Sequence, residues 1–196
     1  RTLAEHSEAV RPLIDKALQD SNVRSKHAAV HCICAMSQGS QWLTTLESIL
    51  GQPLVWVPPG PFRMGSDKQK DSQAGNNELP QHVINLPGYW IGRYPVTVAQ
   101  FRAFVTKRGY KLDERGLRDP DNHPVRYVAW VEARAYCRWL SETTGLSVTL
   151  PSEAEWEKAA RGPDGRLWPW GNEPPDSTRS NFNYNVGTTT PIDQYC

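Results

Sequence analysis

Cysteine and histidine are the residues of this sequence best suited to metal or redox chemistry, and they are few. The chain has four cysteines and five histidines. Cys32 and Cys34 are two residues apart, and His27 and His31, four residues apart, lie just before them. A metal site is one interpretation of this group. The other is buried thiols in a helix, which we favour because Cys-x-Cys is not a zinc-finger spacing and no second ligand pair follows.

The remaining thiols and histidines give weaker signals. Cys137 falls in an amphipathic helical pattern and is expected in the core, and Cys196 is the last residue. No disulfide framework is evident, which favours a cytoplasmic location. His82, in a Pro-Gln-His-Val-Ile stretch, could be a ligand or a base, but a hydrogen-bonded structural histidine is the favoured interpretation.

Two acidic clusters could also do chemistry. Glu153, Glu155 and Glu157 follow Ser152, and Ser152 with Glu155 forms the pattern of a capping box, so the glutamates read as the negative start of a short helix and not as an acid/base dyad. The stretch 119–122, Asp-Pro-Asp-Asn, could suggest calcium. It lacks the EF-hand spacing, so a solvated turn is preferred. No nucleophile elbow, P-loop, dinucleotide fingerprint or His-Glu-x-x-His motif is present.

Composition limits the function classes. Hydrophobic residues make up 38% and eight tryptophans support a core, while sixteen prolines and fourteen glycines indicate many loops. The net charge is +1 without a block of one sign, which argues against nucleic acid or an anionic membrane as partner. No apolar run approaches the roughly 20 residues of a membrane span. The first residues do not read as a signal peptide, so the chain is expected to be part of a larger polypeptide.

Residues 1–51 differ from the rest. Apolar residues recur there at helical spacing, and the stretch from Leu13 to Met36 resembles one HEAT repeat, two helices joined by a turn at 20–22. A single pair cannot bury its own face. We favour the end of a longer helical array over a pair packed on the following domain or a simple helical hairpin.

The sequence pattern of residues 52–196 predicts a second domain, of the α+β class and with much irregular structure. Short strands are expected at 54–57, 62–64, 89–91 and 148–150, with a polar surface loop at 67–81. One helix begins at a Thr97–Gln100 capping box, buries Phe101, Phe104 and Val105, and ends at Gly109. The next helix runs to Gly145. Its expected apolar face is Val128, Val131, Ala135, Trp139 and Leu140.

Four stretches in this second domain carry a resemblance to a known family. They are WVPPGPFRMGSD at 56–67, YWIGRYPVTVAQFRAFV at 89–105, HPVRYVAWVEARAYCRWLSETTG at 123–145, and LPSEAEWEKAARG at 150–162 followed by WPWGN. In this order they resemble the formylglycine-generating enzyme/sulfatase-modifying factor family. The resemblance implies a C-type-lectin-like fold, with the C-terminal part of the family domain missing from this chain.

The resemblance also implies cofactors. Family members hold a structural calcium through an Asn side chain, the next carbonyl, and a second pair a few residues on. Here Asn181 and the Phe182 carbonyl match the first pair, and Asn185 with Val186 or Gly187 is expected to be the second. An Asn-rich turn without an ion is the alternative. Copper is implied only for an oxidase, and none of the four cysteines matches the catalytic thiol pair, which in the family follows a GNVWEW-type motif.

Two functions follow from these observations. The preferred one is a non-catalytic domain that binds a protein or small-molecule ligand, as in the variable proteins of diversity-generating retroelements or in accessory domains of signalling and defence proteins. The alternative is a fragment of a copper-dependent oxidase that converts a sulfatase cysteine to formylglycine.

Overall fold

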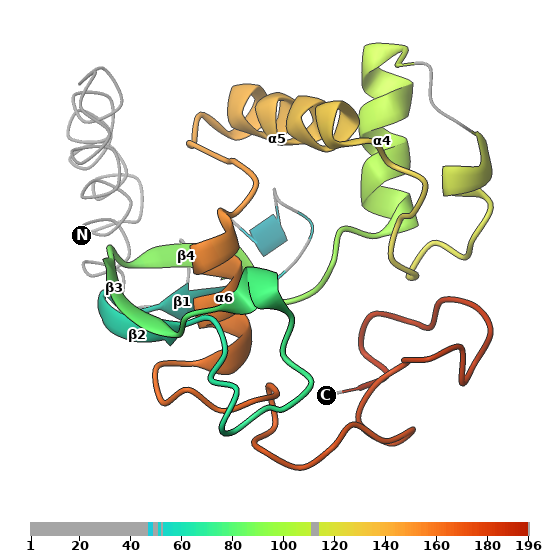
Figure 1. Ribbon diagram of the computed structural model, residues 1–196. Helices are drawn as coiled ribbons and strands as arrows, with labels where there is room; N and C mark the ends of the chain where they lie inside the picture. Colours follow the sequence, from blue (N-terminus) through green and yellow to red (C-terminus); the bar gives the residue numbers. More distant parts are fainter. Residues whose placement is uncertain (1–46, 49–50, 52, 111–113, 196) are drawn as a thin grey trace, which may run out of the picture.

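The computed structural model describes residues 47–48, 51, 53–110 and 114–195 of the chain (Figure 1). The HEAT-like hairpin predicted for 1–51 therefore lies outside the described residues, apart from 47, 48 and 51, and so do Cys32, Cys34, His27, His31 and Cys196. The described part is a mixed α/β structure with small sheets and long irregular connections, which confirms the predicted fold class.

The elements follow one another in the order β1 (Leu54–Val57), β2 (Gly60–Met64), η1 (Asn76–Glu78), β3 (His82–Leu86), β4 (Tyr89–Gly92), α4 (Val98–Arg108), η2 (Glu114–Leu117), α5 (Trp130–Thr144) and α6 (Glu153–Arg161). The polar stretch 67–81 contains η1. Strands form two antiparallel pairs. β1 pairs with β4, from Leu54 opposite Gly92 to Val57 opposite Tyr89. β2 pairs with β3, from Gly60 opposite Leu86 to Met64 opposite His82.

Helices α4 and α5 hold the main core, and they follow β4 along the chain (Figure 1). Gln100 N donates to Thr97 Oγ1 at 3.2 Å and Thr97 N donates to Gln100 Oε1 at 2.8 Å, so the predicted capping box starts α4. Gly109 ends the helix in the left-handed conformation, at φ 58°. Phe101 and Phe104 of α4 pack on Tyr136 and Leu140 of α5. The ring centroids of Phe101 and Tyr136 are 5.4 Å apart, within the range of favourable aromatic pairs.

Two predictions for the segment after α4 were wrong in detail. Val131 is 61% exposed, because the buried face of α5 is formed by Tyr136, Cys137 and Leu140 and the helix begins only at Trp130. The strand expected at 148–150 does not form. Ser141 Oγ instead accepts a hydrogen bond from Val148 N at 2.9 Å and lies 3.1 Å from Val148 O, so a side chain takes the place of a strand partner.

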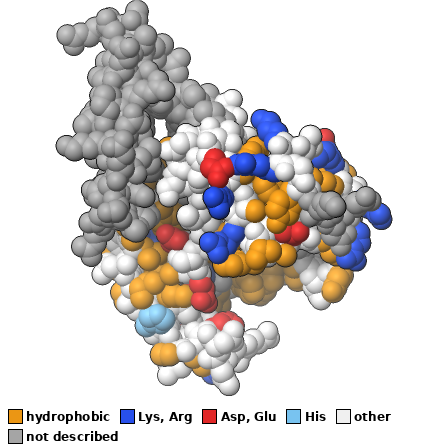
Figure 2. Space-filling model, turned by 90° about the horizontal axis from the view of Figure 1, so that it is seen from above, with side chains coloured by type: hydrophobic (Ala, Val, Ile, Leu, Met, Phe, Trp, Pro, Cys, Tyr) orange, Lys and Arg blue, Asp and Glu red, His pale blue; other side chains and the backbone are white. Residues whose placement is uncertain are grey.

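Large hydrophobic side chains also remain on the surface. Trp130 of α5 and Trp156 of α6 are each more than half exposed. On the face seen from above, hydrophobic side chains lie next to Lys and Arg side chains (Figure 2). Within the described residues, no helix is long and apolar enough to cross a membrane.

Candidate functional site

Helix α6 carries the motif that is richest in charged residues, and it is fixed to the strands by polar contacts. Ser152 N donates to Glu155 Oε2 at 2.8 Å and Glu155 N to Ser152 Oγ at 3.3 Å, which confirms the predicted capping box. Gly162 follows the helix with φ 70°, as predicted for its end. The helix packs against β2. Tyr89 of β4 donates its hydroxyl to Glu155 O at 2.5 Å, and burial raises the pKa of this hydroxyl to about 12.

Lys158 is the buried residue of α6, at 4% exposed. Its Nζ donates to Pro58 O at 2.8 Å and Gly60 O at 3.0 Å, where the chain passes from β1 to β2. Desolvation lowers the pKa of Lys158. Two carbonyl oxygens give the ammonium partial compensation for the water it loses, so this lysine joins the helix to the turn between the strands.

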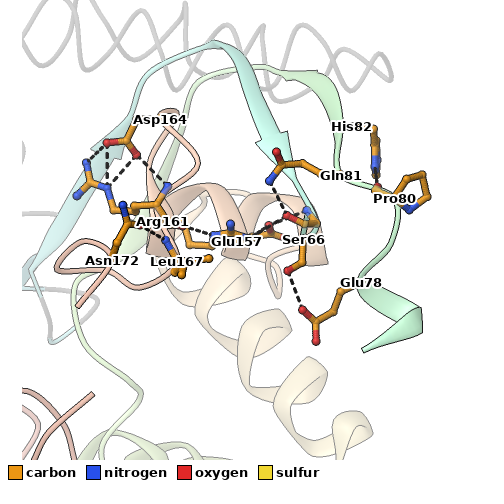
Figure 3. A network of polar contacts seen from close by, with 12 residues as sticks. Ser66, Glu78, Pro80, Gln81, His82, Glu157, Arg161, Asp164, Leu167 and Asn172 are labelled. Carbon is orange, nitrogen blue, oxygen red and sulfur yellow. Dashed lines mark hydrogen bonds and ion pairs between the residues drawn. The ribbon is translucent and has the colours of Figure 1, made fainter. Parts of the chain in front are cut away.

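Glu157 and Arg161 tie α6 to the turn after β2 (Figure 3). Arg161 Nη1 donates to Glu157 Oε1 at 2.7 Å, and the same carboxylate oxygen accepts from Gly65 N at 2.8 Å. Gly65 has φ +82°, and a Cβ there would lie 2.5 Å from Glu78 O. Ser66 continues the network by donating Oγ to Glu78 Oε2 at 2.8 Å, a bond that lowers the pKa of Glu78. Glu157 is therefore a structural anchor and not only helix-start charge.

The loop after α6 extends this framework. Trp168 and Trp170 stack with centroids 6.0 Å apart and planes at 6°. Asn172 Oδ1 accepts from Leu167 N at 3.0 Å (Figure 3), which joins the two ends of the segment that carries both tryptophans. The rigid aromatic loop expected from WPWGN is present.

A second polar cluster joins the segment before α5 to the C-terminal loop. Arg126 donates Nε to Asp119 Oδ2 at 2.6 Å and Nη2 to Asp119 Oδ1 at 2.9 Å. This pair holds the pKa of Asp119 below its usual value, with a further contribution from a hydrogen bond to Thr189. His123 Nδ1 lies 2.9 Å from Thr189 Oγ1. Asp121 is paired with Arg102 and lies in an exposed turn, so the 119–122 stretch is a solvated turn, as preferred, that also carries ion pairs.

The predicted calcium residues lie together in the loop 181–187, where they hydrogen-bond to one another and to neighbouring backbone. Asn181 Nδ2 donates to Thr188 O at 2.7 Å. Asn185 Oδ1 accepts from Phe182 N at 3.0 Å, and Asn185 N donates to Phe182 O at 3.0 Å. Gly187 has a left-handed φ of 76°. Val186 lies between these residues and is exposed. The loop brings the expected oxygen donors close in sequence and space, and calcium stays a prediction.

The described residues do not fit a copper centre. Copper(I) requires soft thiolate ligands, whereas Cys137, the cysteine among the described residues, is buried and its pKa is raised by desolvation. Across the described ranges, no group of three or more His, Cys, Asp or Glu side chains could hold a metal ion. His82 is exposed, and its Nδ1 lies 2.9 Å from Pro80 O, as expected for a hydrogen-bonded structural histidine (Figure 3).

Residues 43–195 match the family described as sulfatase-modifying factor enzyme 1-like domain. The chain belongs to this family. It is 31% identical over 176 residues to hercynine oxygenase of Mycolicibacterium smegmatis, an alignment of 72% of this chain and 40% of that protein. It is 31% identical over 185 residues to the formylglycine-generating enzyme of Thermomonospora curvata, with 71% and 59% covered. The chain thus spans less than two thirds of the length of these curated relatives.

One further relative and one solved structure are also similar to this chain. A segment of the serine/threonine-protein kinase Pkn1 of Chlamydia trachomatis is 34% identical over 175 residues, 76% of this chain and 26% of the kinase. The solved structure of PvdO from Pseudomonas aeruginosa superposes with a TM-score of 0.60 at 24% identity, covering 73% of this chain and 62% of PvdO. This likeness shows the fold of formylglycine-generating enzymes.

Sequence reasoning missed the roles of two charged residues in the sulfatase-modifying factor fold. The burial of Lys158 had no local signal, because its partners Pro58 and Gly60 are about one hundred residues away along the chain. The pairing of Arg126 with Asp119 had a weak signal, because both flank the His-Pro-Val stretch that carries part of the resemblance.

Proposed function

We propose that this chain forms the framework of an oxygenase of the sulfatase-modifying factor type, which oxidises a thiol substrate such as a sulfatase cysteine. The observation that carries the proposal is the 31% identity with a formylglycine-generating enzyme across 71% of the chain. The similarity to a hercynine oxygenase also supports oxygenase chemistry. The relatives thus favour the oxidase alternative over the non-catalytic domain that the sequence alone suggested.

The described residues have a framework role under this proposal. Lys158, Glu157 and Arg161 fix α6 and the turn after β2, and the stacked indoles fix the loop that follows. Such fixed elements are what an active site needs if its reacting groups are to be held in position. Because the described donor set does not fit copper, we assign none of these residues as a metal ligand and derive no step through the metal.

The proposal is tested with the natural protein that contains this chain. We expect oxygen consumption that depends on a sulfatase-derived cysteine peptide and on added copper(I), and no consumption with the same peptide carrying serine in place of cysteine. Residues 1–196 alone are expected to be silent, because they offer no thiolate pair that matches the catalytic one. Turnover by residues 1–196 above the rate without enzyme would contradict the assignment of these residues to the framework.

A second candidate is an accessory domain that binds a ligand or a partner protein. The similarity to about a quarter of the length of a protein kinase favours it, because it shows that a related segment occurs within a protein named for another activity. The oxygen assay distinguishes the two candidates. A folded natural protein without cysteine-dependent oxygen consumption would favour the accessory domain.

We also propose that the loop 181–187 holds a structural calcium ion, through the Asn181 side chain, the Phe182 carbonyl, and Asn185 with Val186 or Gly187. The support is chemical, since amide and carbonyl oxygens are hard ligands of the kind calcium takes. Calcium should raise the melting temperature of the natural protein and chelator should lower it, with Asn181→Ala reducing both effects. A melting temperature that stays constant across a calcium titration would remove this proposal.

A further inference from the structure

An open hollow of about 350 Å³ lies between Arg126 and the C-terminal loop, and it is separate from the α6 framework. Its volume falls within the range of small-molecule sites in proteins. The lining includes Arg126, Phe182, Tyr184 and Thr189. These residues combine a cation, two aromatic rings and a hydroxyl group around one space.

The guanidinium of Arg126 is held in place from one side. Asp119 accepts from Nε and Nη2, and Asp119 is itself hydrogen-bonded to Thr189. Within the described part of the chain, the hydrogen bonds of Arg126 run from Nε and Nη2 to Asp119, so Nη1 lies outside this ion pair. An arginine positioned by a carboxylate can present Nη1, together with the second N–H of Nη2, in a fixed plane, and a carboxylate can accept from both nitrogens.

The backbone around the hollow is unusual. Tyr127, Asn183 and Tyr184 have φ values of 57°, 48° and 57°, and they are the non-glycine residues with positive φ in the described ranges. Tyr127 adjoins Arg126, and the other two line the hollow. Residues in this conformation are found more often at ligand-binding sites than elsewhere.

The two aromatic residues of the hollow are exposed to different degrees. Tyr184 is 91% exposed and Phe182 is 37% exposed. Exposed aromatic rings beside a positioned cation suit a ligand that has both a flat apolar part and a negative charge. Asp119 already neutralises part of the Arg126 charge, which favours a monoanion over a phosphate dianion.

We propose that this hollow binds a small aromatic carboxylate, with its carboxylate on Arg126 Nη1 and its ring against Phe182 and Tyr184. The proposal is independent of the oxygenase activity. It is also compatible with calcium in the same loop, because calcium would use the oxygens of Asn181 and Phe182 and the ligand would use the Phe182 ring.

The test is calorimetric titration of the natural protein with N-acetyl-L-phenylalanine, compared with its uncharged amide. We expect saturable binding of the acid and at least about tenfold weaker binding of the amide, since the difference is one charge-assisted pair. Tyr184→Ala should weaken binding about fivefold. Arg126→Gln should abolish it. Arg179→Gln, which removes an arginine paired with Asp176 and outside the hollow, serves as the control and should leave binding unchanged.

Because Arg126→Gln leaves Asp119 without its partner, the exposed Tyr184 gives the variant that tests binding without disturbing packing. Equal binding of acid and amide would overturn the proposal. So would the absence of saturation up to about 10 mM, or acid binding that neither Tyr184→Ala nor Arg126→Gln reduces.

Discussion

At the scale of single residues, glycine and charged side chains decide how the segments of this chain meet. Gly65 allows Glu157, Arg161 and Glu78 to converge on one turn, because its amide donates to Glu157 and its missing side chain makes room for the Glu78 carbonyl. Lys158 has a comparable role at the other end of β2, where it donates to the carbonyls of Pro58 and Gly60. These contacts join residues that are up to one hundred positions apart.

Gly65→Ala should destabilise the protein strongly. The new Cβ would lie 2.5 Å from a backbone oxygen, and φ is +82°, so both space and conformation oppose it. Gly109→Ala is the matched control, because Gly109 has φ +58° but nothing within 4 Å of an added Cβ. In urea unfolding, we expect Gly65→Ala to lower the free energy of unfolding by about 2 kcal/mol more than Gly109→Ala. Equal losses would show that the turn can move away from Glu78.

The pair of Asp119 with Arg126 should contribute to stability in a pH-dependent way. Arg126 holds the pKa of Asp119 in the folded protein below its unfolded value. Its contribution is therefore present above the unfolded pKa and is lost as pH falls through the folded pKa. Asp119→Asn should lower the free energy of unfolding at pH 7, and the difference from wild type should shrink below about pH 4 in acid titrations. A difference that is constant from pH 7 to pH 2 would contradict this role.

At the scale of secondary-structure elements, the residues that cap the helices could be predicted from the sequence. The segments against which each element pairs or packs could not. Ser152 with Glu155 and Thr97 with Gln100 act within four residues, so local sequence defines where α6 and α4 begin. The missing strand at 148–150 shows the limit, because Val148 bonds to Ser141 of the preceding helix and no strand partner was readable from local pattern.

In the candidate sites, too, local sequence predicted the residues that are close along the chain and did not predict their distant partners. Asn181 to Gly187 could be named because they are consecutive and match a family pattern. The hollow beside them could not, because it depends on Arg126 and Asp119, more than fifty residues earlier in the chain. Val131 was assigned to the core because a helical period alone does not say which side of α5 faces α4.

Removing the N-terminal cap of α6 tests how much this cap contributes to the stability of the protein. Ser152→Ala should lower the free energy of unfolding by about 1 kcal/mol, because it leaves the Glu155 amide without its acceptor. Ser147→Ala, an exposed serine in the loop before α6, should change it by less than about 0.5 kcal/mol. Both are measured by chemical denaturation. Equal effects of the two substitutions would mean that α6 is held by Lys158, Glu157 and Tyr89 regardless of its cap.

At the scale of the whole molecule, the described chain is a framework with two separate polar centres. One fixes α6 to β1–β4, and the other joins the segment before α5 to the C-terminal loop. The second carries the hollow proposed here as a ligand site. The family match extends over both centres.

The central claim is that this framework belongs to an oxygenase, and mass spectrometry of the product tests it most directly. The natural protein is incubated with a sulfatase-derived cysteine peptide, copper(I), oxygen and a thiol reductant that supplies the two electrons for the second oxygen atom. The peptide is then treated with a hydrazide that captures aldehydes. The account predicts a hydrazone at the position of the cysteine, absent from the serine peptide. Recovery of only the unchanged cysteine peptide from a protein shown to be folded would contradict it.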